Sequence, residues 1–231
     1  MTEDPLVTIA RALGERGGHE PSRRGISCYA ALGDSFTAGT GSPDGLGWAD
    51  RIATALRRCN PAFVYRNFAE DGATSADVVG QVDRALQLEP DLVTVICGAN
   101  DVLRSTRPDE TAYARRLSGI FHRLGLAGPR MIVVTATSPA RWDFVPLGPR
   151  TRARVEAGMR SFNEITRGVA REHSVPCLDV ADHPGLSERD NFATDGLHPS
   201  VHGHVRAASA FAALLRDGYG IPIQDVEGET T

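Results

Sequence analysis

Ser35 stands in a stretch of small residues, Gly33-Asp34-Ser35-Phe36-Thr37-Ala38-Gly39, that follows the first strongly apolar run of the chain. Such a hydroxyl can act as a nucleophile in acyl transfer when a base takes its proton and a third group orients that base. His198 can supply the base. Asp195 lies three residues earlier, a spacing that lets its carboxylate fold back onto the imidazole and fix its tautomer. We therefore predict that Ser35, His198 and Asp195 are the nucleophile, the base and the orienting group.

The same reaction needs hydrogen-bond donors for the oxyanion that develops on the substrate. Gly72 has no side chain, so its backbone N–H can approach a substrate closely. Asn100 offers a side-chain NH₂ group. Together with the N–H of Ser35, these groups would form an oxyanion hole of three donors, and losing one such donor typically costs about 10²- to 10³-fold in rate.

Strand-like and helical segments alternate along most of the chain, and these elements must position the five residues. Apolar runs rich in β-branched or aromatic residues have strand length, and amphipathic stretches separate them. This rhythm predicts an α/β protein with a five-stranded, doubly wound parallel sheet in a three-layer α/β/α sandwich. The predicted strands are 26–32, 63–68, 92–97, 131–135 and 175–180, and the predicted helices between and after them are 48–58, 75–88, 110–124, 151–173 and 204–215.

The length of 231 residues fits one large domain. We expect a short helix at 5–15 and a linker within 1–25, one domain over 26–216, and a polar, peripheral C-terminal tail over 217–231. In a doubly wound sheet, ligands bind beyond the carboxyl ends of the strands. The segments that carry the five residues all follow such strand ends, so we expect them to meet at one edge of the sheet.

Charge, cysteine usage and hydropathy narrow the class of protein. The net charge of −4 argues against a nucleic-acid binder that works by charge neutralisation. No 18-residue apolar run suggests a membrane span. The acidic N-terminus lacks the features of a secretory signal. The four cysteines, Cys28, Cys59, Cys97 and Cys177, form no CxxC pair, and three of them lie in strand-like runs. We therefore expect buried free thiols and a reduced, cytoplasmic protein.

Four motifs in register resemble the SGNH (GDSL-like) hydrolases, and the resemblance covers residues 26–215. The motifs are Gly33-Asp34-Ser35-Phe36-Thr37-Ala38-Gly39, the segment from Asn67 to Ser75, Gly98-Ala99-Asn100-Asp101, and Asp195-Gly196-Leu197-His198-Pro199. The resemblance implies a flavodoxin-like sheet, no metal or other cofactor, and ester hydrolysis of the esterase or lipase type through an acyl-enzyme at Ser35. It also implies Asp195 and His198 as the base pair, and Gly72 and Asn100 as oxyanion donors.

Glu70 and Asp71 depart from the family pattern, because smaller or neutral residues more often precede the glycine of this motif. Two carboxylates there could disfavour anionic substrates, or they could simply point into solvent. The larger α/β-hydrolase family does not fit, since its G-x-S-x-G elbow requires a glycine where Thr37 stands. His198 and His202 are four residues apart, but Pro199 places His198 before the helix, so we do not expect a metal site.

Four bulky side chains, Trp48, Leu103, Trp142 and Phe144, are candidates for a substrate pocket at the active-site edge. The alternative for the residues around Trp142 is that they merely bury a long loop. Three functions remain open for the site: an esterase, an acyltransferase or deacetylase that tailors a sugar or natural product, and a flavodoxin-like module that binds a flavin or phosphate ligand. In each case we expect a small-molecule partner, and the oligomeric state is not predicted.

Overall fold

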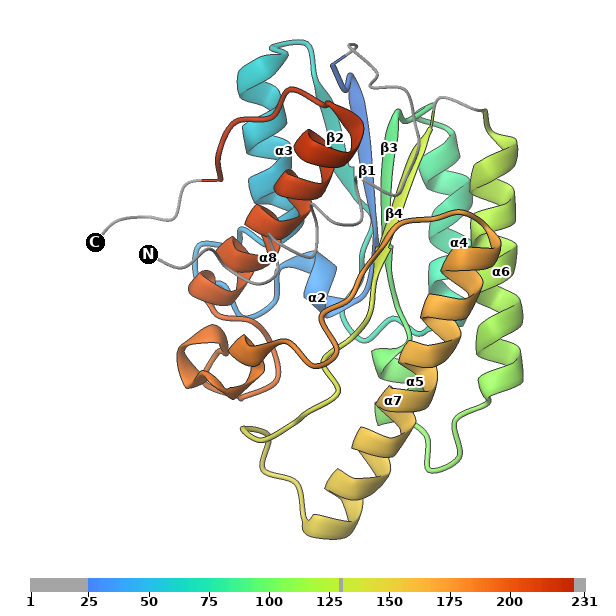
Figure 1. Cartoon of the computed structure of the whole chain (residues 1–231), viewed down its shortest axis with the longest axis vertical. Coiled ribbons are helices and arrows are strands. Elements are labelled where there is room, and N and C mark those ends of the chain that lie inside the picture. Colours follow the sequence, from blue (N-terminus) through green and yellow to red (C-terminus); the bar gives the residue numbers. More distant parts are fainter. Residues whose placement is uncertain (1–24, 129–130, 227–231) are drawn as a thin grey trace.

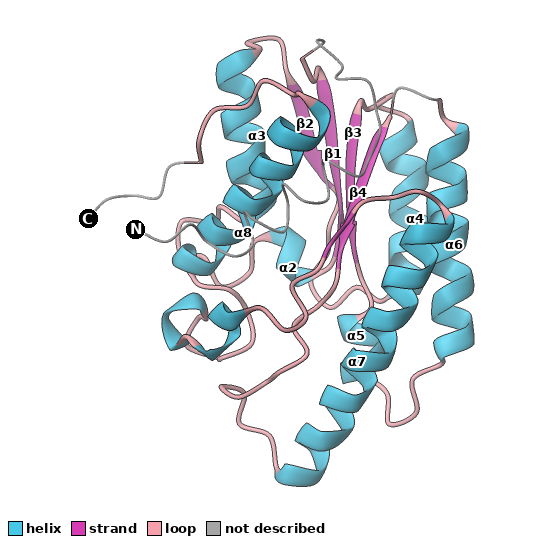
Figure 2. Cartoon of the chain, viewed as in Figure 1, coloured by secondary structure: helices cyan, strands magenta, loops and turns pink. Residues whose placement is uncertain are grey.

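The computed structural model describes residues 25–128 and 131–226, and its centre is a five-stranded parallel sheet with the order β2-β1-β3-β4-β5. Helices cover both faces, as Figures 1 and 2 show: α3 and α8 lie on one side of the sheet, and α4, α6 and α7 lie on the other. The predicted three-layer α/β/α architecture is confirmed. The strands are β1 (Cys28–Gly33), β2 (Val64–Asn67), β3 (Leu92–Ile96), β4 (Ile132–Ala136) and β5 (Cys177–Leu178).

The last strand is shorter than its apolar run at 175–180 predicts, because both ends of that run bond elsewhere. The Val175 N–H donates to the carbonyl of Ala170 at the end of the preceding helix, at 2.8 Å. The Val180 N–H donates to the Thr137 side chain, also at 2.8 Å. Only Cys177 and Leu178 therefore pair with β4.

The five long predicted helices are present, with ends that differ by a few residues from the predicted ones. The structure adds short helical segments that the sequence analysis missed, because three to five residues are too few to show a helical period. The long helices are α3 (Trp48–Cys59), α4 (Ser75–Leu86), α6 (Glu110–Leu126), α7 (Pro149–Glu172) and α8 (Val201–Ala213), which continues as a π-helical turn, Leu214–Gly218; the short segments are α2 (Ser35–Ala38), α5 (Ala99–Leu103) and the 3₁₀ turns Pro184–Ser187 and Arg189–Asn191.

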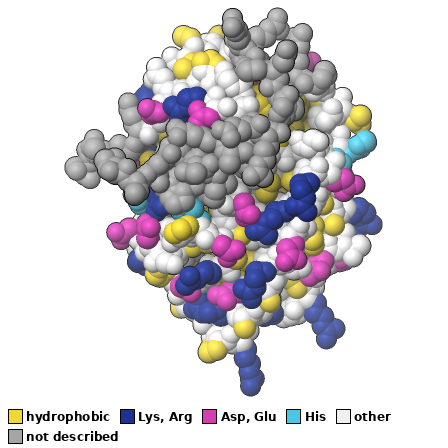
Figure 3. Space-filling view, in the orientation of Figure 1, with side chains coloured by type: hydrophobic (Ala, Val, Ile, Leu, Met, Phe, Trp, Pro, Cys, Tyr) yellow, Lys and Arg dark blue, Asp and Glu magenta, His cyan; other side chains and the backbone are white. Residues whose placement is uncertain are grey.

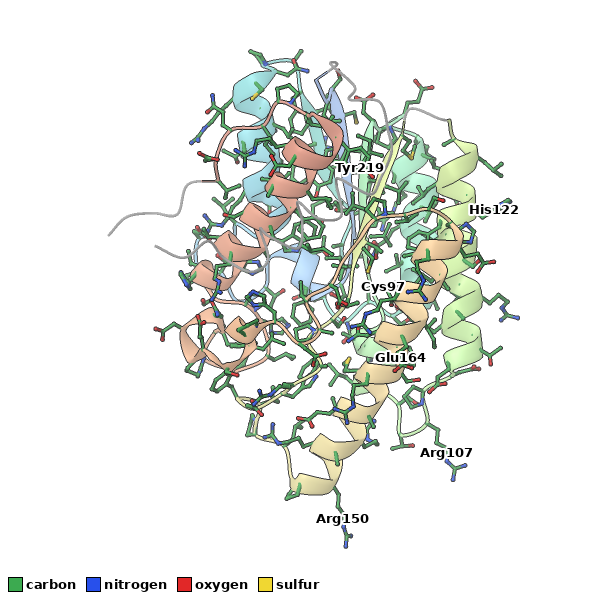
Figure 4. The ribbon with its side chains drawn as sticks, in the orientation of Figure 1. Cys97, Arg107, His122, Arg150, Glu164 and Tyr219 are labelled. Carbon is green, nitrogen blue, oxygen red and sulfur yellow. The ribbon has the colours of Figure 1, made fainter. Side chains whose placement is uncertain are left out.

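The core consists of two apolar clusters, one on each face of the sheet. Successive residues of β1 alternate between them: Tyr29 and Ala31 pack under α3 and α8, whereas Ala30 and Leu32 pack under α4 and α6. Because both faces are covered, the central strands are mostly apolar rather than alternating regularly with polar residues. Cys97 belongs to the second cluster, and Figure 4 shows its side chain in the interior.

The C-terminal segment corrects one prediction. Residues 217–231 are expected to form a polar, peripheral tail, yet Tyr219, Ile221 and Ile223 are buried and belong to the cluster under α3 and α8. These three apolar side chains are spaced two apart, too short a pattern to stand out beside the acidic residues that follow. The predicted N-terminal helix at 5–15 lies outside the described residues, and the predicted division of the chain into domain and termini remains a prediction.

Charged side chains of both signs are interspersed over the face shown in Figure 3. Arg107 and Arg150 extend away from the body of the molecule in Figure 4. Within the described part of the chain, none of the helices is long and apolar enough to cross a membrane.

The chain reverses direction across the sheet at β1, since β2 lies on one side of this strand and β3 on the other. A crevice forms at such a switch point, beyond the carboxyl ends of the strands. Asp34 follows β1 there and begins α2, because its carboxylate accepts from the Phe36 N–H at 3.1 Å. Gln81 of α4 holds the preceding residue: its amide accepts from the Gly33 N–H at 2.8 Å and donates to the Gly33 carbonyl at 2.9 Å.

Asp34 generates a prediction about stability and pH. Burial raises the pKa of its carboxyl from 3.8 to about 7, although the bond from the Phe36 N–H works in the opposite direction. A carboxyl whose pKa is raised on folding contributes stability that is fully present below pH 3.8 and is lost as the pH rises through about 7. Asp34→Asn retains the capping acceptor without the titration. We expect the free energy of unfolding of the wild type to fall by about 2–3 kcal/mol relative to this variant between pH 5 and pH 8.

Urea denaturation of both proteins at pH 5, 6, 7 and 8 measures this difference. Parallel curves of unfolding free energy against pH would show that Asp34 does not titrate in this range.

Candidate active site

Ser35 lies at the carboxyl end of β1, where it is the first residue of α2 and is 7 % exposed. Its Oγ lies 2.9 Å from His198 Nε2. His198 Nδ1 lies in turn 2.6 Å from an oxygen of the Asp195 carboxylate. Because Nδ1 donates to the carboxylate, Nε2 is left as the acceptor, so it can take the hydroxyl proton of Ser35. The structure thus brings together the three residues that the sequence analysis selected.

The Asp195 carboxylate is held in place by the turn that it begins. Its other oxygen accepts from the backbone N–H groups of Leu197 at 2.9 Å and His198 at 3.0 Å. Partial desolvation acts to raise the pKa of this carboxyl, but the bonds from the His198 ring and from the two backbone groups outweigh it and lower the pKa. Asp195 therefore remains an anion that can stabilise an imidazolium at His198.

Contacts within the loop that carries His198, and a close approach by Gly41, hold this loop in place. The Ala193 N–H donates to the His198 carbonyl at 2.8 Å, and Phe192 pairs with Pro199 in an antiparallel bridge. On the opposite side, Gly41 approaches so closely that a Cβ there would lie 2.4 Å from the Pro199 carbonyl oxygen and 2.9 Å from His198 Cβ. Any larger residue at position 41 would therefore clash with the segment that carries His198.

His204 connects helix α8 to the segments that follow Ser35. This side chain is fully buried, and its Nδ1 accepts from the Trp48 N–H at 3.2 Å while Nε2 donates to the Thr40 carbonyl at 3.2 Å. Burial lowers the pKa of His204 to about 4, so it is neutral at physiological pH. His204 is thus a structural histidine.

Of the two predicted oxyanion donors, Gly72 lies in the loop that follows β2, and Asn100 is the second residue of α5, which follows β3. Gly72 has a φ of +75°, a conformation that favours glycine. Asn100 Nδ2 donates to the Ala73 carbonyl at 3.0 Å and lies 3.5 Å from Asp34 Oδ2. One amide hydrogen is therefore held by the Gly72–Ala73 loop, whereas the contact with Asp34 is too long to be a strong bond. That second N–H is the one available to a substrate oxygen.

Two residues that the sequence analysis did not assign to the site hold the segment from Gly72 to Ser75 in place. Asp101 accepts from the Ser75 N–H at 2.7 Å and from the Ser75 hydroxyl at 2.6 Å. The Arg104 guanidinium donates to the Gly72 carbonyl at 2.7 Å. The position of Asp101 directly after Asn100 was the available signal, but nothing in the sequence pointed to Arg104.

The two carboxylates that depart from the family pattern have local partners. Glu70 forms an ion pair with Arg84 at 2.7 Å, and Asp71 accepts from the Thr40 hydroxyl at 2.6 Å. Both carboxylates are exposed. Of the two interpretations of this pair, the structure favours a solvent-facing, loop-joining role over a role in repelling substrates.

The four predicted pocket residues do not form one pocket. Trp48 lines an apolar cavity of about 140 Å³ between the sheet and α8. Leu103 and Trp142 pack in the cluster on the other face of the sheet, where the Trp142 indole N–H donates to the Pro139 carbonyl at 3.1 Å. Phe144 packs against Phe192, with ring centroids 5.2 Å apart. Of the four residues only Trp48 lines this cavity, and the grouping of all four into one substrate pocket remains a prediction.

Among the residues that the structure describes, no group of three or more His, Cys, Asp or Glu side chains is arranged to hold a metal ion. His202 is exposed, whereas His198 is engaged by Ser35 and Asp195.

Comparisons with known proteins agree with this architecture. A family model described as the GDSL-like Lipase/Acylhydrolase family matches residues 31–206. The uncharacterized protein YpmR of Bacillus subtilis (strain 168) is 30% identical over 89% of this chain and 88% of its own length. The crystal structure of a lipase/acylhydrolase from Enterococcus faecalis matches with a TM-score of 0.66 at 20% identity, over 87% of this chain and 99% of that one.

An acetyl xylan esterase from Geobacillus stearothermophilus, solved as a variant, matches with a TM-score of 0.65 at 19% identity, over 86% of this chain and 97% of that one. At such identities the structural matches show the fold, whereas the family model also spans the segments that carry Ser35, Gly72, Asn100, Asp195 and His198. The chain belongs to the GDSL-like lipase/acylhydrolase family, the SGNH hydrolases.

Proposed function

We propose that the protein is a serine hydrolase that cleaves carboxylic esters through an acyl-enzyme on Ser35. The observation that carries this proposal is the continuous pair of hydrogen bonds from Ser35 Oγ through His198 to Asp195, at 2.9 and 2.6 Å. Both distances lie within the range that a nucleophile and its general base require. Membership of a hydrolase family supports the same conclusion.

In the first half of the reaction, Ser35 Oγ attacks the ester carbonyl carbon as its proton passes to His198 Nε2. The carbonyl oxygen becomes an oxyanion, which the N–H groups of Ser35, Gly72 and Asn100 stabilise. When the tetrahedral intermediate collapses, the ester C–O bond breaks and the alcohol leaves with the proton from Nε2. In the second half, water attacks the acyl carbon and gives a proton to Nε2. The bond between the acyl carbon and Ser35 Oγ then breaks, Nε2 returns the proton to Oγ, and the carboxylic acid leaves.

Two other uses of the same site were open from the sequence. An acyltransferase would deliver the acyl group to an alcohol instead of water, and a binding module would not react at all. Measuring acyl transfer to added alcohols against hydrolysis separates the first from an esterase. Reaction of Ser35 with a fluorophosphonate would exclude the second.

The nucleophile is tested by Ser35→Ala. Since this substitution removes the attacking oxygen, we expect kcat/KM for a p-nitrophenyl acetate substrate to fall by about 10⁴-fold or more. A fluorophosphonate probe should label the wild type at Ser35, as located by peptide mass spectrometry, and should leave the variant unlabelled. The matched control is Ser161→Ala, whose hydroxyl bonds Glu110 on the surface at 2.6 Å and should be dispensable for turnover. Equal rates for Ser35→Ala and wild type would refute the proposal.

The oxyanion role of Asn100 is tested by Asn100→Ala. We expect kcat to fall by about 10²- to 10³-fold with little change in KM, because the lost donor acts mainly in the transition state. Asn100 also bonds the Ala73 carbonyl, so the melting temperature of the variant must be measured beside its kinetics. Arg104→Ala, which loosens the same loop from the Gly72 carbonyl, is the control for a purely structural effect. Equal losses of kcat in the two variants would assign Asn100 to loop support alone.

A further inference from the structure

A short hydrogen bond joins the segment that begins at Ser35 to the segment of the predicted oxyanion donors. The Thr40 hydroxyl donates to the Asp71 carboxylate, with 2.6 Å between the two oxygen atoms. In the part of the chain that the structure describes, no other hydrogen bond joins residues 35–47 to residues 69–75. The bond is thus a direct connection between the nucleophile's segment and the oxyanion segment.

The Thr40 end of this bond is fixed relative to the nucleophile. The Thr40 N–H donates to the Ser35 carbonyl at 3.1 Å, and the Thr40 carbonyl accepts from Nε2 of the buried His204 at 3.2 Å. The side chain is β-branched, which restricts its rotation about the Cα–Cβ bond. Thr40 therefore presents its hydroxyl from a position that Ser35 and α8 both define.

The Asp71 end of the bond adjoins the backbone donor itself, because the Gly72 N–H belongs to the peptide unit between Asp71 and Gly72. This unit is the centre of a turn that is closed by the Ala73 N–H, which donates to the Glu70 carbonyl at 3.0 Å. The Gly72 φ of +75° suits the third residue of a type II turn, where φ is about +80°. Among the described residues, no acceptor bonds the Gly72 N–H, so this group is available to a substrate oxygen.

The position of the turn depends on bonds from outside it. Arg104, directly after α5, donates to the Gly72 carbonyl at 2.7 Å. Towards β1, the Glu70 N–H donates to the Gly33 carbonyl, but the distance of 3.3 Å indicates a weak bond. The bond from Thr40 is much shorter, and a hydroxyl that donates to a carboxylate belongs to the stronger class of hydrogen bonds. It is therefore the main restraint between the turn and the end of β1.

We propose that Thr40 and Asp71 are positioning residues, whose hydrogen bond holds the Gly72 N–H where it can stabilise the oxyanion formed at Ser35. This inference rests on the proposed ester hydrolysis. An ionised carboxylate has no proton to donate, and its negative charge opposes a developing oxyanion, so Asp71 assists the reaction only through the position of the turn. The bond and the charge of Asp71 therefore affect the rate in opposite directions, which makes the two effects separable.

The donor side is tested by Thr40→Val, which keeps the shape of the side chain and removes the hydroxyl. We expect kcat for p-nitrophenyl acetate to fall about tenfold with KM nearly unchanged, a part of the 10²- to 10³-fold loss that follows complete removal of an oxyanion donor. Thr40→Ser retains the hydroxyl and should restore most of the activity. If Thr40→Ser is as slow as Thr40→Val, the methyl group rather than the bond is responsible, and the proposal is wrong.

The acceptor side is tested by Asp71→Ala and Asp71→Asn. Asp71→Ala should lower kcat about tenfold, as Thr40→Val does, because it removes the same bond. Asp71→Asn keeps an oxygen that can accept from Thr40 and should retain kcat within about threefold of the wild type. An increase in kcat for both variants would show that Asp71 acts through its charge and would overturn the proposal.

The double variant Thr40→Val/Asp71→Ala shows whether the two side chains act through one bond. If they do, its kcat should be no lower than that of the slower single variant. Independent effects would multiply to a loss of about 100-fold, and that result would contradict the proposal. Phenylboronic acid forms a tetrahedral adduct with a nucleophilic serine, so its inhibition constant at Ser35 should rise in each variant by the factor by which kcat falls.

The matched control is a hydrogen bond of the same type and length far from Ser35 in the fold. The Ser161 hydroxyl of α7 donates to the Glu110 carboxylate of α6 at 2.6 Å. Ser161→Ala and Glu110→Ala should keep the wild-type kcat. Melting temperatures are measured for every variant, and a loss of kcat that follows the melting temperature across both pairs would show a general loss of structure instead of a positioning effect.

The proposed function and the positioning role fail in different ways. If the protein is not an esterase, the wild type will cleave esters no faster than Ser35→Ala, and the positioning role falls with it. If only the positioning role is wrong, the wild type will cleave esters and react with a fluorophosphonate, while Thr40→Val and Asp71→Ala will match its kcat.

Discussion

The hydrogen bond between Ser35 and His198 joins residues 163 positions apart, and the arrangement of the fold makes it possible. It requires Ser35 Oγ, at the end of the first strand, to lie 2.9 Å from His198 Nε2, in the loop before the last helix. A parallel sheet satisfies this requirement, because all its strands end at the same edge and connections of any length return there. The order β2-β1-β3-β4-β5 then places Ser35 at the point where the chain changes direction across the sheet.

The precision of the site comes from groups around the reacting residues. Gln81 holds both backbone groups of Gly33, and Asp34 begins the helical turn that presents Ser35. Asp101 and Arg104 brace the loop that carries Gly72, and His204 fixes the loop after Ser35 to α8. Asp34 is fully buried, which is energetically unfavourable for a carboxylate. The carboxyl caps α2 at this position and faces the Asn100 amide. Ionisable groups with strongly shifted pKa values are common in active sites.

The two faces of the sheet are packed differently near the site. On one face, Trp142 and Leu103 pack in the apolar cluster under α4, α6 and α7. On the other, the space between the sheet and α8 is not completely filled, although Trp48 and Phe211 stack within it.

The sequence by itself determined the fold class and the succession of strands and long helices along the chain. It also marked the five residues of the candidate site. These features follow from local patterns: apolar periodicity defines the elements, and short motifs at strand ends mark Ser35, Gly72, Asn100, Asp195 and His198. The family motifs could be identified from the sequence because each of them is contiguous in the chain.

Only the tertiary structure decided which bulky residues adjoin the site, because Trp48 and Trp142 look alike in sequence but pack on opposite faces of the sheet. It also revealed the bracing contact of Arg104 with Gly72, the buried C-terminal residues around Ile221, and the hydrogen bond between Thr40 and Asp71. Each of these depends on contacts between segments far apart in the chain or on the exact filling of space. No local pattern encodes such contacts, so they emerge only when the elements are packed together.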